Sequence, residues 1–111
     1  MSKAISLTEL TLTSDVQGAI WSHGGEQLNV NLLSFTEGEG VDAHINHALD
    51  VWLVVIQGTG EAMVDGKRIP LDVGTCLYIT AGASRAIHAG SGGLLYASAH
   101  QKRGGLMPTL P

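Results

Sequence analysis

Charged residues, cysteine and aromatic residues are all scarce in this chain of 111 residues. The single cysteine, Cys76, excludes an intramolecular disulfide and favours a reducing, cytoplasmic location. Six basic residues stand against ten acidic ones, so nothing in the charge attracts nucleic acid or an anionic membrane. No apolar run approaches a membrane span, and the N-terminus lacks the layout of a signal peptide. We therefore expect a soluble, cytoplasmic protein with no nucleic-acid or membrane partner.

The length of the chain suits one domain with one core. We expect residues 1–111 to form a single domain, with an N-terminal arm over 1–17 and a C-terminal tail over 101–111. Hydrophobic residues make up 44% of the chain and charged residues only 14%. With so few charges, some apolar surface should be buried against a second copy, which predicts a homodimer. Cys76 lies in an apolar run and is expected to be a buried structural thiol.

The 15 glycines and the short apolar runs predict strands joined by tight turns, not helices. Residues 28–32 alternate between apolar residues and asparagines, which is typical of a strand with one buried face. Residues 51–56 are all apolar, which indicates a strand covered on both faces. Asp65-Gly66 suits a type I′ turn and predicts a hairpin, whereas residues 36–43 read as a connection rich in glycine and acidic residues. The remaining strands are expected at 19–21, 61–64, 67–71, 75–79, 85–89 and 94–99.

Two stretches on either side of that hairpin share a framework of glycines. The first is Gly38-x5-His44-x-Asn46-x3-Asp50-x7-Gly58, and the second is Gly74-x5-Thr80-x-Gly82-x2-Arg85-x3-Ala89. They resemble the paired motifs of the cupin family, which read Gly-x5-His-x-His-x3,4-Glu-x6-Gly and Gly-x5-Pro-x-Gly-x2-His-x3-Asn. The resemblance covers roughly residues 28–100 and implies an all-β fold, the cupin-type double-stranded β-helix or jelly-roll barrel.

In cupins the two motifs supply three histidines and a glutamate that bind a metal ion inside the barrel mouth. Only the first of these ligands, His44, is kept in this chain. Asn46, Asp50 and Arg85 stand at the other three positions, and an amide is a poorer ligand for a transition metal than an imidazole. The guanidinium of Arg85 is permanently charged and repels a cation. The resemblance therefore predicts the barrel with a degenerate metal site.

If Asp50 and Arg85 both face inward, they can form an ion pair where the metal would otherwise lie. The spacing from Asp50 to Gly58 is one residue longer than in the family motif. A β-bulge would absorb that residue, but a shifted register would place Val51 at the carboxylate position instead. The sequence leaves both registers open.

We interpret the chain as a barrel that binds a small, anionic molecule, with no metal or other cofactor. In this interpretation Arg85 clamps the ligand, Asp50 orients Arg85, and His44 donates or accepts a proton. The residues expected to bind the ligand are His44, Asn46, Asp50, Arg85 and His100.

Two alternatives remain. A metal-dependent cupin enzyme, a dioxygenase or an isomerase, would hold a divalent transition metal with His44, His47 and Asp50, or with a rearranged His100. A metal-free sugar isomerase or epimerase would use His44 as a base beside a tyrosine. An inward-facing Arg85 argues against the metal enzyme.

Overall fold

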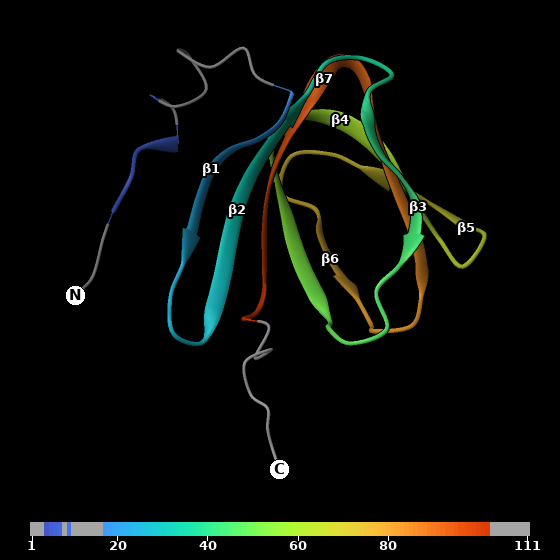
Figure 1. Cartoon of the computed structure of the whole chain (residues 1–111). Coiled ribbons are helices and arrows are strands. Elements are labelled where there is room, and N and C mark those ends of the chain that lie inside the picture. The colour runs from blue at the N-terminus through green and yellow to red at the C-terminus, as the bar shows by residue number, and fades with distance from the viewer. Residues whose placement is uncertain (1–3, 8, 10–16, 103–111) are drawn as a thin grey trace.

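A computed structural model describes residues 4–7, 9 and 17–102 of the chain, so most of the predicted N-terminal arm and C-terminal tail lies outside the described residues. In the described part, strands form an antiparallel jelly-roll barrel, which confirms the predicted all-β cupin fold (Figure 1). The strands are β1 (Gly18–Gly24), β2 (Leu28–Phe35), β3 (Gly40–Ile45), β4 (Val51–Val64), β5 (Lys67–Leu71), β6 (Cys76–Ile79) and β7 (Ser84–Gln101). No helix among the described residues has the length and apolar character needed to cross a bilayer.

Strands β4 and β7 connect the two sheets of the barrel. They pair with each other from Val51 opposite His100 to Val64 opposite Arg85, and both bend near the middle at glycines. The first half of β4 and the second half of β7 lie in a sheet with β1, β2 and β6, which we call the first sheet. The other halves lie in a second sheet with β3 and β5. The separate strands predicted for these segments are therefore halves of two long, bent strands.

The bend of β4 requires a glycine at position 58. Gly58 has a φ angle of +84°, and a Cβ atom there would lie 2.1 Å from the backbone oxygen of Gly93 in β7. Any side chain would push the two bent strands apart. The close approach lets both strands turn together from one sheet into the other.

The core lies between the two sheets. Strand partners that face each other directly have their side chains on the same side of a sheet, so the pairing shows which residues point inward. The buried inward residues are Phe35, Leu53, Val55, Ala62, Leu71, Ile79, Ala83, Ile87, Ala89, Leu94 and Tyr96. Burial raises the pKa of Tyr96 to about 12.

Two local predictions are wrong. The glycine- and acid-rich connection contains strand β3, whose Val41 pairs with Ile87 of β7 and packs against the core. Most of β3 is exposed, so it shows no alternating apolar pattern, and its pairing with β7 is what makes it a strand. Cys76 is exposed, because it lies opposite Val54 on the outer face of the first sheet.

Candidate functional site at the open end of the barrel

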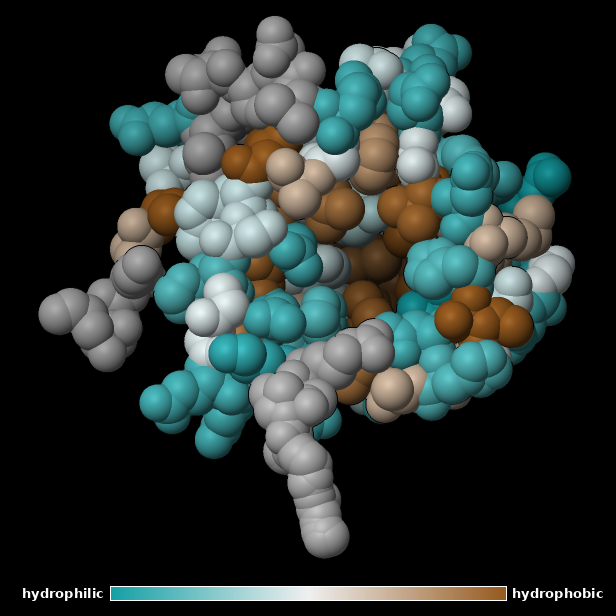
Figure 2. Space-filling model, viewed as in Figure 1, coloured by the Kyte–Doolittle hydropathy of each residue, from teal (hydrophilic) through white to brown (hydrophobic). Residues whose placement is uncertain are grey.

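The predicted site residues gather at the end of the barrel opposite the glycine bends. The turns at residues 25–27, 46–50 and 80–83 lie together at this end, at the bottom of Figure 1, and we call it the open end. Figure 2 shows the same view in space-filling form, with a hollow near the middle of the molecule that has a hydrophobic floor.

Arg85 faces into the barrel. It alternates along β7 with the core residues Ile87 and Ala89, and it lies opposite His44 of β3 and Val64 of β4. Its side chain is buried, with 4% of the residue exposed. Among the described residues, no carboxylate forms an ion pair with it. Arg85 is therefore a buried, inward-facing cation, and the carboxylate of Asp50, which would be its counterion, does not contact it.

Backbone carbonyl groups of the turn before β7 hold the guanidinium instead. Nε donates to the oxygen of Ala83 at 2.9 Å, and Nη2 donates to the oxygen of Thr80 at 3.1 Å. Neither carbonyl carries a full negative charge. The guanidinium of Arg85 thus has hydrogen-bond partners, but no carboxylate of the described residues forms an ion pair with it.

The predicted ion pair between Asp50 and Arg85 is wrong, because Asp50 is exposed and turned away from the barrel. Val51 is the residue that faces inward: it pairs with His100 and Ile79 and shares a face with the core residue Leu53. Side chains alternate along a strand, so an inward Val51 sends Asp50 to the outside.

Asp50 instead ties two turns together at the rim. Its Oδ2 accepts a hydrogen bond from the hydroxyl of Tyr78 at 2.5 Å, and its Oδ1 accepts one from the backbone N–H of Ala81 at 2.7 Å. These two bonds, led by that of Tyr78, lower the pKa of Asp50, and the same contact with Asp50 raises the pKa of Tyr78. Asp50 is thus linked to Arg85 only indirectly, through the turn at 80–83 that both residues bind.

Asn46, like Asp50, holds two turns together by hydrogen bonds to backbone groups. Its side-chain oxygen accepts hydrogen bonds from the backbone N–H groups of Ala48 at 2.9 Å and Leu49 at 3.1 Å. Its backbone oxygen accepts one from Gly82 at 2.8 Å. Asn46 therefore organises the turn at 46–50 and joins it to the turn at 80–83.

The three histidines of the predicted site do not converge. His44 is exposed beside Arg85, with its Nδ1 3.0 Å from the backbone oxygen of Asp42. His47 is exposed in the turn after β3. His100 is half-buried on the first sheet, where its pairing with Asn29 and Val51 places it on the inward face near the rim. Across residues 4–7, 9 and 17–102, no three His, Cys, Asp or Glu side chains lie close enough to hold a metal ion.

The sequence reasoning missed three polar residues that face into the barrel from the first sheet, namely Asn29, Asn31 and Ser98. Asn31 pairs with Ser98, and Ser98 pairs with the core residue Leu53. The alternation over 28–32 placed both asparagines on one face, and the same parity extends to Phe35 in the core. This shared face with Phe35 could have shown that the asparagines point inward. It was missed because inward positions are usually occupied by apolar residues.

Several polar atoms on these inward faces have no partner in the described part of the chain and are in contact with solvent. Every side-chain nitrogen or oxygen sealed from solvent in the described residues has a hydrogen-bond partner. In that part of the chain Nη1 of Arg85, Oγ of Ser98 and the amide of Asn29 have no partner, so each of them reaches solvent. The hydroxyl of Ser22 donates to Oδ1 of Asn31 at 2.7 Å, which leaves the amide nitrogen of Asn31 available.

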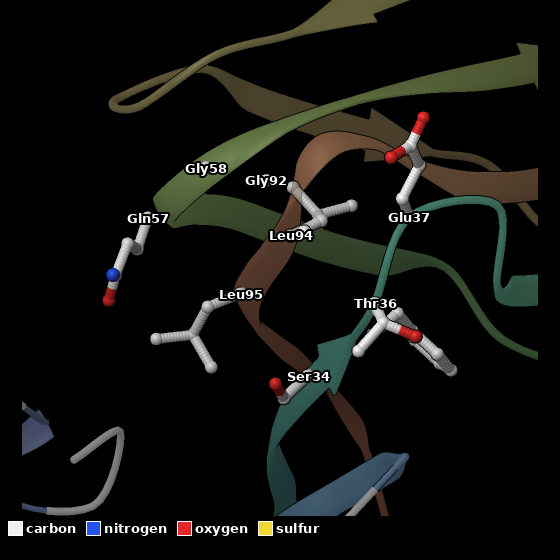
Figure 3. Close-up of a pocket in the computed structure, with 10 residues that line it drawn as sticks. Ser34, Thr36, Glu37, Gln57, Gly58, Gly92, Leu94 and Leu95 are labelled. Atoms are coloured by element: carbon white, nitrogen blue, oxygen red, sulfur yellow. The ribbon is translucent and has the colours of Figure 1, made fainter. Parts of the chain in front are cut away.

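Two grooves lie elsewhere on the described part of the molecule. A groove of about 390 Å³ at the bend end contains none of the predicted site residues, and in Figure 3 its Gln57 and Glu37 side chains point away from each other on either side of Leu94 and Leu95. A groove of about 330 Å³ at the rim is lined by Asp50, Tyr78 and His100, among others. Neither groove includes Arg85.

Comparisons with known proteins agree on the fold. The family model described as a cupin domain matches residues 31–94. A crystal structure of BH2720 from Bacillus halodurans superposes with a TM-score of 0.78 and 20% identity, covering 100% of this chain and 85% of that one. A cupin protein from Bacteroides fragilis has a TM-score of 0.63 and 23% identity over 78% of this chain and 75% of that one. A predicted oxalate decarboxylase from Thermotoga maritima has a TM-score of 0.62 and 19% identity over 65% of this chain and 64% of that one. No curated protein matches the sequence.

Proposed function

The chain belongs to the cupin domain family, and from this premise we propose that its barrel binds a small anionic molecule at Arg85. The observation that carries the proposal is the buried guanidinium of Arg85, which is 4% exposed and has no carboxylate partner among the described residues. Keeping a charge away from water without an opposite charge is unfavourable. An anionic ligand would supply the missing charge.

The geometry of the guanidinium supports the same ligand chemistry. Nε and one hydrogen of Nη2 are used by the carbonyl groups of the turn at 80–83. The remaining donors, on Nη1 and Nη2, form a fork that matches the two oxygens of a carboxylate or phosphate. His44 lies beside Arg85 and is available to exchange a proton with the ligand. Asp50 orients Arg85 through the turn and not by direct contact.

The residues present do not fit the divalent transition metal of the alternative, a cupin dioxygenase or isomerase. Of the four family ligand positions only His44 still offers an imidazole, and Asn46 and Asp50 direct their oxygens to backbone groups and Tyr78. The fourth position holds Arg85, whose charge repels a cation. These donors favour an anion at the open end over a metal ion.

We also propose that the protein is a cytoplasmic homodimer that associates through the outer face of the first sheet. Strand pairing places Val30 of β2, Trp52 and Val54 of β4, and Tyr78 of β6 on this face, whereas Leu32 of β2, on the same face, is already buried within the chain. Trp52 is 42% exposed and Tyr78 is 60% exposed, so two large aromatic side chains lie open on this face and a partner would cover them. A two-fold dimer joins one patch to itself, and this patch consists of uncharged residues with the carboxylate of Asp50, bound to the hydroxyl of Tyr78, at its edge.

Thermal unfolding with simple anions tests the binding proposal. Acetate or phosphate, compared with chloride at equal ionic strength, should raise the Tm of the wild-type protein. The variant Arg85→Met should lose the increase, whereas Arg68→Met, which removes an exposed arginine of the second sheet, should keep it. An equal increase in wild type and Arg85→Met would show that the anions act elsewhere.

A further inference from the structure

The open end of the barrel presents different chemistry on its two facing sheets. The second sheet contributes the buried charge of Arg85 and the imidazole of His44. The first sheet contributes uncharged amides and a hydroxyl, with an imidazole at the rim. We call these residues the inner polar set: His44 and Arg85 on one sheet, and Asn29, Asn31, Ser98 and His100 on the other.

From this division we infer that the ligand is a hydroxylated carboxylic acid of the sugar-acid type. The inference rests on the proposed function, since it assumes that the carboxylate binds Arg85. Asn29, Asn31 and Ser98 offer both donors and acceptors, as a chain of ligand hydroxyl groups requires. An unsubstituted hydrocarbon tail would instead leave these polar groups without partners when it displaced their water.

Burial and charge favour a single carboxylate over a more highly charged anion. Arg85 is the one charged residue that is buried in the described part of the chain. One guanidinium balances one negative charge, and the facing sheet adds no second permanent cation at Asn29, Asn31 or Ser98. Deeper in the barrel the inward residues are apolar, which limits the polar part of the ligand to the open end.

The parts of the molecule that would bind the hydroxyl groups are already in place. The hydroxyl of Ser22 donates to the side-chain oxygen of Asn31 at 2.7 Å, which fixes that oxygen and leaves the amide nitrogen free to donate to a ligand. Ser98 is 8% exposed and lies between Asn31 and Leu53 across the sheet. Groups fixed before the ligand arrives lose little conformational entropy on binding.

Calorimetric titration with three probes tests the inference. Gluconate carries a carboxylate and hydroxyl groups, hexanoate has the same number of carbons and the carboxylate alone, and glucose has the hydroxyl groups without the charge. Wild-type protein should bind gluconate at least about tenfold more tightly than hexanoate, and glucose least, since each hydrogen bond contributes roughly 2- to 10-fold. Hexanoate binding as tightly as gluconate would overturn the sugar-acid inference.

Substitutions separate this inference from the proposed function. Ser98→Ala and Asn31→Ala should weaken gluconate and leave hexanoate unchanged, whereas Arg85→Met should weaken both acids. Ser34→Ala, on the outer face of β2, is the matched control and should change neither. Should the variants fail to fold, the comparison of gluconate with hexanoate on wild-type protein still decides. Binding of both acids with equal, Arg85-dependent affinity would reject the sugar acid and keep the anion site. Binding of neither acid would reject both proposals.

Discussion

Replacing Arg85 by methionine tests whether this buried charge serves a ligand or the fold. Methionine has a similar length and no charge, so the change removes the guanidinium and largely preserves the volume. If Arg85 is kept for ligand binding, the protein without ligand should tolerate its loss. If Arg85 anchors the turn at 80–83, its loss should unfold the open end.

The expected change in the free energy of unfolding follows from the contacts of Arg85. Apolar replacement of a whole buried ion pair is often neutral or stabilising by about 1–4 kcal/mol in other proteins, and the loss of Arg85 likewise leaves no described carboxylate unpaired. Against this, the Ala83 oxygen loses its donor, which costs about 1–3 kcal/mol if the group stays buried. The Thr80 oxygen keeps a bond from the N–H of Ala83. We therefore expect Arg85→Met to lie within about 2 kcal/mol of wild type, on the stabilising side.

Urea unfolding, followed by the fluorescence of Trp21 and Trp52, measures the effect as a shift in midpoint at unchanged slope. All samples need one protein concentration, because dimerisation would add to stability. Arg68→Met is the control, since Arg68 pairs with Glu61 at 3.3 Å on the exposed surface and its removal should change stability by less than about 0.5 kcal/mol. A loss of about 3–5 kcal/mol in Arg85→Met, as for a broken buried ion pair, would refute the reasoning and make Arg85 structural.

Three further predictions concern pH, assembly and metal content. Burial raises the pKa of Tyr96 to about 12 in the folded protein, against 10.0 in the unfolded chain. The contribution of its neutral phenol to the free energy of unfolding is therefore complete below pH 10 and is lost as the pH rises toward 12. Between about pH 9 and 11.5 the wild type should lose about 2 kcal/mol more than Tyr96→Phe in urea unfolding, and equal losses would contradict the burial of the phenol. Val54→Asp should dissociate the dimer in sedimentation experiments while Val73→Asp, in an exposed loop, should not; a wild-type monomer at micromolar concentration would end the dimer proposal. Elemental analysis of protein purified without added metal should find well below one transition-metal ion per chain, and stoichiometric metal that His44→Ala abolishes would restore the enzyme alternative.

The sequence alone was sufficient to predict the fold, because its evidence lies in local backbone requirements. The framework glycines Gly38, Gly58, Gly74 and Gly82 all have positive φ angles, between 84° and 91°. Asp65 and the glycine after it also have positive φ angles, as the hairpin turn requires. Such backbone conformations favour particular residue types whatever surrounds them, so their spacing can be read without a structure.

The candidate site was predicted only in part, because strand register decides which side chains point into the barrel. The sequence left open whether Asp50 or Val51 faces inward, because a shift of one residue exchanges the two, and the ion pair with Arg85 depended on the register that the structure does not have. The partners of Arg85 could not be predicted either. They are backbone carbonyl groups of the turn at 80–83, and backbone groups leave no trace in residue identity.

The tertiary structure alone decided which polar residues meet at the open end. Asn31 and Ser98 are 67 positions apart in the chain and become neighbours only when β2 pairs with β7. Arg85 and Ser98 lie on the same strand, yet the bend at residues 90–93 carries them onto opposite sheets. Local sequence preferences determine where the chain turns, but which side chains face each other is set by pairing between distant strands, and that pairing is a property of the whole barrel.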